Sequence, residues 1–310
     1  MSDAALPSGA WPVMLTPFNE NRSIDWAALE SYTDWLIELG SAGLFAVALS
    51  SEMYDLTRDE RLELSARVVE RAAGRVPVVA SSIASGSAGE QAEEAREVAQ
   101  TGVAAVVLIS SLVARNDQPE SVWLSNIDAI LSANAGVDFG IYECPLPYKR
   151  LPSVDAVRHL ADSGRFTFYK DTSHSLEVMS DRIGAMEATR LRLYNAAIGS
   201  LTPSLRLGAS GLSGYAANLY PDLVSWLCQN LDDARAPDVQ RLLTVVEHSV
   251  NLRYPTSAKY LLDRSSRLDF RPISRWKPEV VGDHEGLPLQ HLADYLRDLD
   301  LPAAALAPGR

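Results

Sequence analysis

A lysine and a tyrosine close two successive apolar runs of the sequence, and their types suit carbonyl chemistry. Lys170 ends the run RFTFYK, and Tyr142 lies near the end of the preceding run, VDFGIYE. Burial at a strand end disfavours the charged ammonium and lowers the pKa of a lysine. A neutral amine can attack a carbonyl to form a Schiff base, and a phenol beside it can relay protons. Taken singly, each has a plainer explanation, a lysine that leaves the strand for solvent and a core tyrosine hydrogen-bonded at the rim.

Small polar side chains lie at or near the ends of other apolar runs and are candidates for binding a substrate. Ser50 and Ser51 follow the run LFAVAL, and their backbone N–H groups and hydroxyls could hold a carboxylate. Asn195 ends RLRLYN, and Ser213 lies within GLSGYA. Hydrogen bonding within a loop is the commoner use of serines, so that alternative stays open. With Leu49, these four residues form the predicted substrate-binding set.

Eight short apolar runs, rich in β-branched residues, would position these side chains. They occupy residues 11–17, 44–50, 76–83, 103–109, 137–143, 165–170, 190–196 and 211–216. Runs of this length and composition are typical of strands buried on both faces. Helical stretches separate them, and two begin with a capping-box spacing, Thr57 with Glu60 and Ser87 with Glu90. Glycines that suit a left-handed helix end follow four of the stretches: Gly40, Gly74, Gly102 and Gly164.

Alternating strands and helices without hairpin signals require parallel strands joined by right-handed crossovers. Eight such units predict an α/β fold, a (β/α)8 TIM barrel, in which the reacting groups gather at the carboxyl ends of the strands. An open doubly wound sheet would usually have a glycine-rich turn after its first strand, and the turn TPFNENRSID contains no glycine. Amphipathic helices are predicted near 235–251, 256–265 and 288–299. We therefore predict a catalytic barrel domain over 1–225 and a C-terminal helical region over 226–310.

Composition argues against several other classes of protein. The net charge is −12, from 28 basic and 40 acidic residues, which would repel nucleic acid. The first ten residues lack the features of a signal peptide, and no segment has the roughly 18 consecutive apolar residues of a membrane span. Cys144 and Cys228 are expected to be reduced thiols, and the five histidines lie far apart. We therefore predict a cytoplasmic protein with no nucleic acid, membrane, metal or cofactor.

Several segments, taken in order, resemble the family of dihydrodipicolinate synthase and N-acetylneuraminate lyase. They are GAWPVMLTPFNENRSIDWAALESYTDWLIELGSAGL from residue 9, YECP at 142–145, YKDTS at 169–173, GASGLSGYAANLYP at 208–221 and YPTSAKYLL at 254–262. The resemblance implies a class I aldolase mechanism, with Lys170 as the imine-forming nucleophile and Tyr142 as the proton relay. It also implies a 2-oxo acid substrate and a homo-oligomer, a dimer or more commonly a tetramer.

The chain departs from the family pattern where the second substrate would bind. A Gly-Thr-Thr-Gly-Glu motif of many members aligns with ALSSE at 48–52, so that the hydroxyl-relay threonine falls on Leu49 and a carboxylate-binding threonine on Ser50. A tyrosine offered across the subunit interface aligns with Ala114, and an arginine for the second substrate aligns with Pro147. The resemblance thus implies that the imine-forming part of the mechanism is retained and that the part involving the second substrate is altered.

The leading hypothesis is an aldolase or lyase that makes or cleaves a C–C bond of a 2-oxo acid, with pyruvate as the common donor or product. Three enzyme alternatives use the same imine: a 4-hydroxy-tetrahydrodipicolinate synthase, a hydratase-aldolase and a dehydratase. A further alternative, from another class, is a barrel that has lost catalysis and binds a 2-oxo or sugar acid.

Overall fold

Eight parallel strands stand at the centre of the structure, a computed structural model that describes residues 5–251, 253–266, 268–277 and 282–298. The strands are β1 (Gly9–Ala10), β2 (Leu44–Val47), β3 (Val78–Ser82), β4 (Ala105–Ile109), β5 (Phe139–Tyr142), β6 (Phe166–Asp171), β7 (Arg192–Asn195) and β8 (Gly211–Leu212). They pair in the order β1, β8, β7, β6, β5, β4, β3 and β2. A parallel bridge between Val13 and Phe45 links the segment after β1 to β2 and closes the ring. The predicted (β/α)8 barrel is confirmed.

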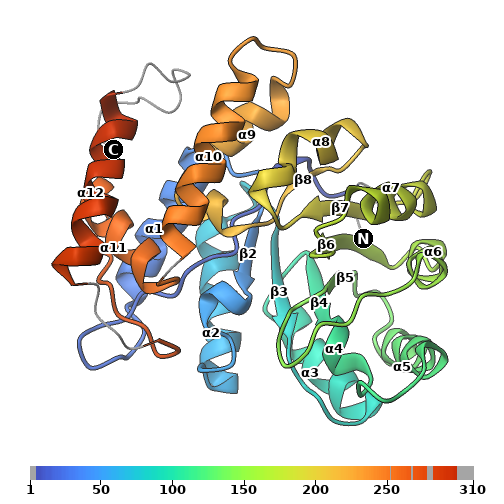
Figure 1. Ribbon diagram of the computed structural model, residues 1–310. Helices are drawn as coiled ribbons and strands as arrows, with labels where there is room; N and C mark the ends of the chain where they lie inside the picture. Colours follow the sequence, from blue (N-terminus) through green and yellow to red (C-terminus); the bar gives the residue numbers. More distant parts are fainter. Residues whose placement is uncertain (1–4, 252, 267, 278–281, 299–310) are drawn as a thin grey trace.

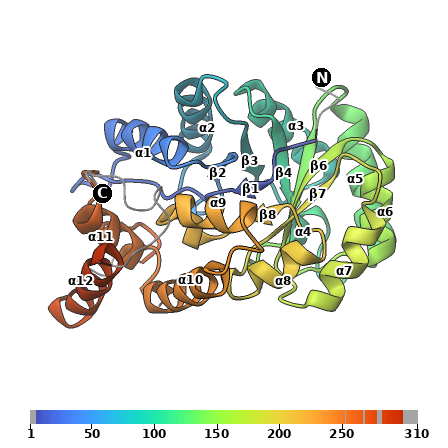
Figure 2. The same ribbon diagram turned by 90° about the horizontal axis from the view of Figure 1, so that it is seen from above.

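Helices surround the strands and continue beyond them at the C-terminal side (Figures 1 and 2). They are α1 (Trp26–Glu38), α2 (Arg58–Ala72), α3 (Ala88–Gln100), α4 (Ser110–Val113), α5 (Glu120–Ala133), α6 (Val154–Asp162), α7 (Leu176–Ala185), α8 (Leu201–Arg206), α9 (Pro221–Gln229), α10 (Ala236–Asn251), α11 (Thr256–Ser265) and α12 (Asp283–Asp298). Three short 3-10 helices lie in loops after β2, β7 and β8: η1 (Leu49–Ser51), η2 (Ile198–Ser200) and η3 (Tyr215–Asn218). In the described part of the chain, no helix is both long and apolar enough to cross a membrane.

The helix boundaries follow the capping signals of the sequence. Thr57 and Glu60 exchange the two hydrogen bonds of a capping box at the start of α2. Ser87 and Glu90 do the same at α3. The four predicted helix-ending glycines have φ values between 63° and 89°, where only glycine is free of steric cost. These predictions are confirmed.

The first strand differs from its prediction. The ladder of β1 covers only residues 9 and 10, whereas the sequence predicts a strand over 11–17. Pro12 and Pro17 interrupt that run, and proline has no N–H to donate to a neighbouring strand. The segment still follows the barrel wall, because Met14 N donates to Phe45 O at 3.0 Å. At Gly211 of β8, a Cβ atom would lie 1.9 Å from Gly9 O, so β1 and β8 can meet only over a glycine.

The barrel interior is filled by aromatic side chains, which remove water from the strand ends above them. Trp11, Phe168 and Tyr194 are in mutual ring contact, with centroid distances of 4.8 to 5.3 Å. Phe45 packs edge-on against Phe168 and Tyr142. All five side chains are buried. A polar group at the top of this core is therefore partly desolvated, which sets the conditions for the chemistry described below.

Helices form in all three predicted C-terminal segments; α12 packs on α10 and α11, and residue 299, the last of the predicted segment 288–299, lies outside the described residues. Helix α10 packs on η2 and η3, so it covers the loops after β7 and β8. Glu52, directly after η1, forms a buried ion pair with Lys259 of α11, with 2.5 Å between Oε1 and Nζ. The predicted domain boundary between residues 225 and 226 falls inside α9, and the division into two domains stays a prediction. The C-terminal region thus contributes directly to the carboxyl end of the barrel.

Candidate active site

Lys170 and Tyr142 lie side by side at the carboxyl ends of adjacent strands. They are register partners in the β5–β6 ladder. Lys170 Nζ lies 4.3 Å from the centre of the Tyr142 ring and 5.7 Å from that of Phe45. The lysine is only 5% exposed. Because the side chains of strand-end neighbours point to the same end of a parallel barrel, this contact is the one that their positions in the sequence predict.

Burial gives Lys170 the reactivity of a neutral amine. Loss of water lowers its pKa to about 7, although Cys144 and Glu247 favour the charged form. Among the described residues, none forms a hydrogen bond or ion pair with its Nζ. Lys259 is also buried, but its Nζ pairs with Glu52 and donates to Ile273 O at 2.7 Å. Of these two buried amines, only that of Lys170 has no hydrogen bond or ion pair within the described part of the chain.

The rate of imine formation should depend on pH through this lysine. A group with a pKa of about 7 is largely protonated at pH 6 and largely neutral at pH 8, so adduct formation with pyruvate should rise about tenfold over this range and then level off. An ordinary lysine, with a pKa of about 10.4, would keep gaining roughly tenfold per pH unit. Borohydride quenching at timed intervals and mass spectrometry would measure the rate. A steady rise beyond pH 9 would contradict the assigned pKa.

Tyr142 belongs to a buried hydroxyl and thiol cluster. Its hydroxyl is hydrogen-bonded to the thiol of Cys144, which also interacts with the hydroxyl of Tyr54. Burial raises the pKa of Tyr142 well above its usual value. The phenol therefore stays protonated near neutral pH and can act as a proton donor. Tyr54 also donates to Leu146 O at 3.0 Å, which ties this cluster to the loop after β5.

The two predicted serines after β2 have different surroundings. The Ser51 hydroxyl bonds to the carbonyls of Met14 and Ala46, each at 2.7 Å, and accepts from Ala48 N. These bonds fix the loop, and they leave the hydroxyl no capacity to bind a substrate. The Ser50 side chain is instead hydrogen-bonded to the hydroxyl of Tyr254. Of the pair, Ser50 is the one whose hydroxyl belongs to a chain of polar groups at the barrel mouth.

Asn195 ends β7, Ser213 directly follows β8, and both are fully buried. Asn195 Nδ2 donates to the hydroxyls of Ser200 and Ser204, at 2.9 and 3.0 Å, and Oδ1 accepts from Ala197 N. These bonds hold the loop after β7. The Ser213 hydroxyl has no hydrogen-bond partner among the described residues. A buried hydroxyl without a partner is costly, so Ser213 is the better placed of the two to bind a ligand.

Sequence reasoning missed two groups that the C-terminal region brings to the site. Tyr254, from the segment between α10 and α11, is hydrogen-bonded to Ser50 and accepts from Asn218 Nδ2 at 3.0 Å. It also acts electrostatically on Tyr142. Glu247 of α10 acts on Lys170. The periodicity that predicts these helices does not say which of their residues face the barrel.

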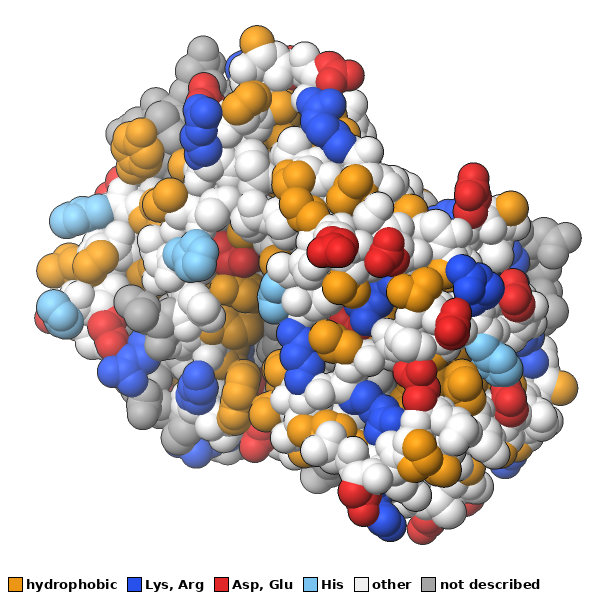
Figure 3. Space-filling view, turned by 45° about the vertical axis from the view of Figure 1, so that its right-hand side comes forward, with side chains coloured by type: hydrophobic (Ala, Val, Ile, Leu, Met, Phe, Trp, Pro, Cys, Tyr) orange, Lys and Arg blue, Asp and Glu red, His pale blue; other side chains and the backbone are white. Residues whose placement is uncertain are grey.

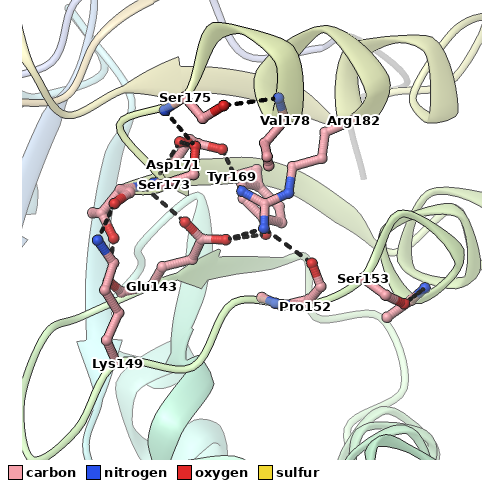
Figure 4. A network of polar contacts seen from close by, with 12 residues as sticks. Glu143, Lys149, Pro152, Ser153, Tyr169, Asp171, Ser173, Ser175, Val178 and Arg182 are labelled. Atoms are coloured by element: carbon pink, nitrogen blue, oxygen red, sulfur yellow. Dashed lines mark hydrogen bonds and ion pairs between the residues drawn. The ribbon is translucent and has the colours of Figure 1, made fainter.

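A buried ion network supports the strand that carries Lys170 (Figure 4). Arg182 of α7 is 2.5 Å from Asp171 Oδ2 and 2.8 Å from Glu143 Oε1. Glu143 also accepts from the Tyr169 hydroxyl at 2.6 Å and from Thr172 N at 2.8 Å. Burial raises the pKa of Glu143 to about 7, against the opposing effect of Arg182. Arg182 therefore pairs directly with Asp171, after Lys170, and is linked through Glu143 to Tyr169, before it.

Comparison with known proteins places the chain in a family. The model of the dihydrodipicolinate synthetase family matches residues 6–264. The chain belongs to this family. The family comprises pyruvate-dependent enzymes of the class I aldolase type, so the chain is an enzyme of the carbon–carbon lyase kind.

Curated relatives and solved structures of the dihydrodipicolinate synthetase family extend over most of the chain. The 4-hydroxy-tetrahydrodipicolinate synthase of Oceanobacillus iheyensis is 26% identical over 257 residues, covering 82% of this chain and 85% of the relative. That of Chelativorans sp. is 28% identical over 267 residues, covering 84% and 89%. The dihydrodipicolinate synthase of Bacillus anthracis has a TM-score of 0.82 at 22% identity, covering 95% and 98%. The E. coli K12 prophage protein YagE, solved in complex with pyruvate, has a TM-score of 0.82 at 19% identity, covering 94% and 99%.

Two of the positions where this member departs from the family pattern lie at one surface pocket. Ala114 and Pro147 line a pocket of about 740 Å³ beside the loops after β4 and β5. The two cations that follow Pro147 are both engaged with backbone carbonyls. Lys149 donates to Thr172 O, and Arg150 donates to two carbonyls at 3.0 Å each. Because both side chains are engaged in this way, neither takes the place of the arginine that would bind the carboxylate of a second substrate.

Proposed function

We propose that this protein forms a Schiff base between Lys170 and a 2-oxo acid, with pyruvate as donor or product, and makes or cleaves a C–C bond. The observation that carries the proposal is the buried, unpaired amine 4.3 Å from the centre of the Tyr142 ring. The amine adds to the keto carbon to give a carbinolamine, and loss of water gives the imine. The iminium then accepts the electron pair of the C–C bond that breaks. In the reverse direction, the enamine attacks an aldehyde.

Within this proposal, the other predicted residues bind and orient the substrate. The carboxylate of the 2-oxo acid would lie near the Ser50 and Ser51 loop, because the backbone of η1 and the Ser50 hydroxyl stand at the barrel mouth. The unpartnered Ser213 hydroxyl, directly after β8, supports a second contact from a strand end that only β1 separates from β2. Asn195 and Ser51 act by fixing their loops, and Leu49 packs against the core. Neither Lys170 nor Tyr142 requires a cofactor for this chemistry.

Borohydride trapping tests the proposal directly. Incubation with pyruvate and sodium borohydride should add the reduced pyruvyl group to the protein, and peptide mapping should place it on Lys170. A panel of other 2-oxo acids would be run in parallel. If no 2-oxo acid gives an adduct but several raise the melting temperature by mass action, the protein is a binding barrel and not a lyase.

Replacing Tyr142 by phenylalanine should separate imine formation from turnover. The ring that packs against Phe45 is kept, so the barrel and the amine stay in place while the proton donor is lost. We expect the borohydride adduct to form and turnover to fall about a hundredfold, the lower end of the range for a general acid or base. Full turnover in the variant would show that another group moves the proton.

The second substrate is expected to differ from that of a 4-hydroxy-tetrahydrodipicolinate synthase. Ala114 and Pro147 occupy the positions that align with the tyrosine and arginine of the family pattern, and the tyrosine and arginine that line the neighbouring pocket, Tyr148 and Arg115, come from other positions. This supports an aldolase, hydratase-aldolase or dehydratase that acts on another acceptor. We also infer a cytoplasmic homo-oligomer, a dimer or tetramer, on the resemblance to the family. Light scattering coupled to gel filtration would measure its mass.

A further inference from the structure

Glu247 brings a carboxyl group from outside the barrel strands to the loops at the barrel mouth. It lies on α10, which packs on η2 and η3, the 3-10 helices after β7 and β8. The backbone amides of Ile198 in η2 and Ala216 in η3 interact with its carboxylate and favour the ionised form. Figure 2 shows α10 beside α8 and α9. The carboxyl group is therefore anchored over the end of the barrel where Lys170 lies.

One oxygen of this carboxyl group is left without a partner. Glu247 is 9% exposed, and its buried Oε2 forms no hydrogen bond to any described residue. Its electrostatic interactions reach the groups at the barrel mouth, Lys170, Tyr215 and Tyr254. Burying a carboxyl group with an unsatisfied oxygen costs folding free energy. A contribution to stability therefore does not explain the position of Glu247, whereas a role in binding or converting a ligand does.

The other buried glutamates of the described chain each pair with a cation, as expected of carboxylates with a structural role. Glu52 pairs with Lys259, Glu94 with Arg61 and Glu143 with Arg182, each within 2.9 Å. Glu247 forms no such pair with any cation in the described ranges. Burial instead raises its pKa to about 7. A carboxyl group with that pKa can both accept and return a proton near neutral pH.

Glu247 and Tyr142 reach Lys170 from different sides. Tyr142 comes from β5, one neighbour of β6, whereas Glu247 is held by the loops that follow β7 and β8 on the other side of β6. An imine on Lys170 would therefore have the phenol on the β5 side of β6 and the carboxyl group on the β7 side. On the face shown in Figure 3, a hollow runs between two lobes of the surface, with hydrophobic and charged side chains around it.

We propose that Glu247 is a second catalytic residue, the base that removes a proton from C3 of the 2-oxo acid once it is bound to Lys170 as an imine. The inference rests on the proposed function. Oε2 takes the C3 proton, the C–H electron pair becomes the C2=C3 double bond, and the iminium π pair moves to nitrogen, which gives a neutral enamine. The reverse step returns the proton from Glu247 to C3. No oxidant, reductant or further reactant is needed.

Exchange of the pyruvate methyl protons in D2O measures this step without knowledge of the second substrate. In the wild-type protein, NMR should show loss of the methyl signal, and borohydride should trap the adduct. Glu247→Gln should still give the adduct, while exchange falls about a hundredfold or more. Exchange within threefold of the wild-type rate in that variant would overturn the proposal and leave the imine intact. Absence of any adduct in the wild type would instead overturn the proposed function.

Two further variants separate a chemical role from a structural one. Asp238→Asn removes an exposed carboxylate from the same helix, where it pairs with Arg241, and should leave the exchange rate unchanged. Glu247→Ala should exchange slowly and recover in proportion to added formate, a small carboxylate that can occupy the vacated space. Formate should not restore exchange to Glu247→Gln, whose amide still fills that space. If Glu247→Ala exchanges the methyl protons at the wild-type rate and added formate does not change that rate, the carboxylate has no part in the step.

Discussion

Replacing Lys170 by alanine is expected to abolish the borohydride adduct and to lower turnover by about 10⁴-fold or more, a loss typical of removing a covalent nucleophile. In the proposed mechanism this amine holds the 2-oxo acid as an imine, and without it the site can bind the acid but cannot activate it. The fold should survive, because removing the buried amine also removes the cost of desolvating a cation. Circular dichroism and thermal melting would establish that the variant is folded.

The small number of lysines makes this test sharp. The sequence has four: Lys149, Lys170, Lys259 and Lys277. Lys149→Ala is the matched control, since its amine also lies near the barrel mouth but donates to the carbonyl of Thr172. It should retain the adduct. Peptide mapping should find Lys259 unmodified, because its amine is engaged by Glu52 and the carbonyl of Ile273. Turnover that persists in Lys170→Ala would eliminate the imine mechanism.

The sequence predicts the central pair of the site because that pair depends on local signals. Lys170 and Tyr142 each end an apolar run, and in a parallel barrel the ends of successive runs become neighbours. The register of β5 with β6 then places them opposite one another. The same logic brings Asn195 and Ser213 to the mouth, since Ser213 N donates to Asn195 O at 2.8 Å. The fold and the strand-end residues follow from one periodic pattern.

Side-chain partners and the C-terminal contribution could not be predicted in this way. The Ser51 hydroxyl bonds to carbonyls of residues 14 and 46, and nothing local distinguishes it from Ser50. Glu247 and Tyr254 reach the site only because α10 packs on the loops after β7 and β8. That packing depends on contacts between distant parts of the chain, whereas the amphipathic pattern states only that a helix forms. For the same reason, the sequence does not predict that Arg182 pairs with Glu143 and Asp171.

Replacing Arg182 by methionine is expected to destabilise the protein by about 3–5 kcal/mol, because it leaves two buried carboxylates without their shared cation. Arg182 is 1% exposed and bonds to Asp171, Glu143 and the carbonyl of Pro152. Urea unfolding would measure the loss. Without the guanidinium, the already raised pKa of Glu143 should rise further, since Arg182 now opposes the effect of burial. The loss should therefore be greatest at pH 8 and smaller at pH 5, where Glu143 is protonated in the variant.

An exposed ion pair supplies the contrast that isolates burial as the cause. Arg158→Met removes a guanidinium that lies 3.1 Å from Asp155 on the surface of α6, and it should change stability by no more than about 1 kcal/mol. Because Arg182 is linked to the residues on both sides of Lys170, its loss should also slow imine formation under conditions where the variant is still folded. If Arg182→Met were as stable as Arg158→Met at pH 8, the network would not be what holds β6 in place, and the position of the reactive amine would have to depend on the aromatic core beneath it.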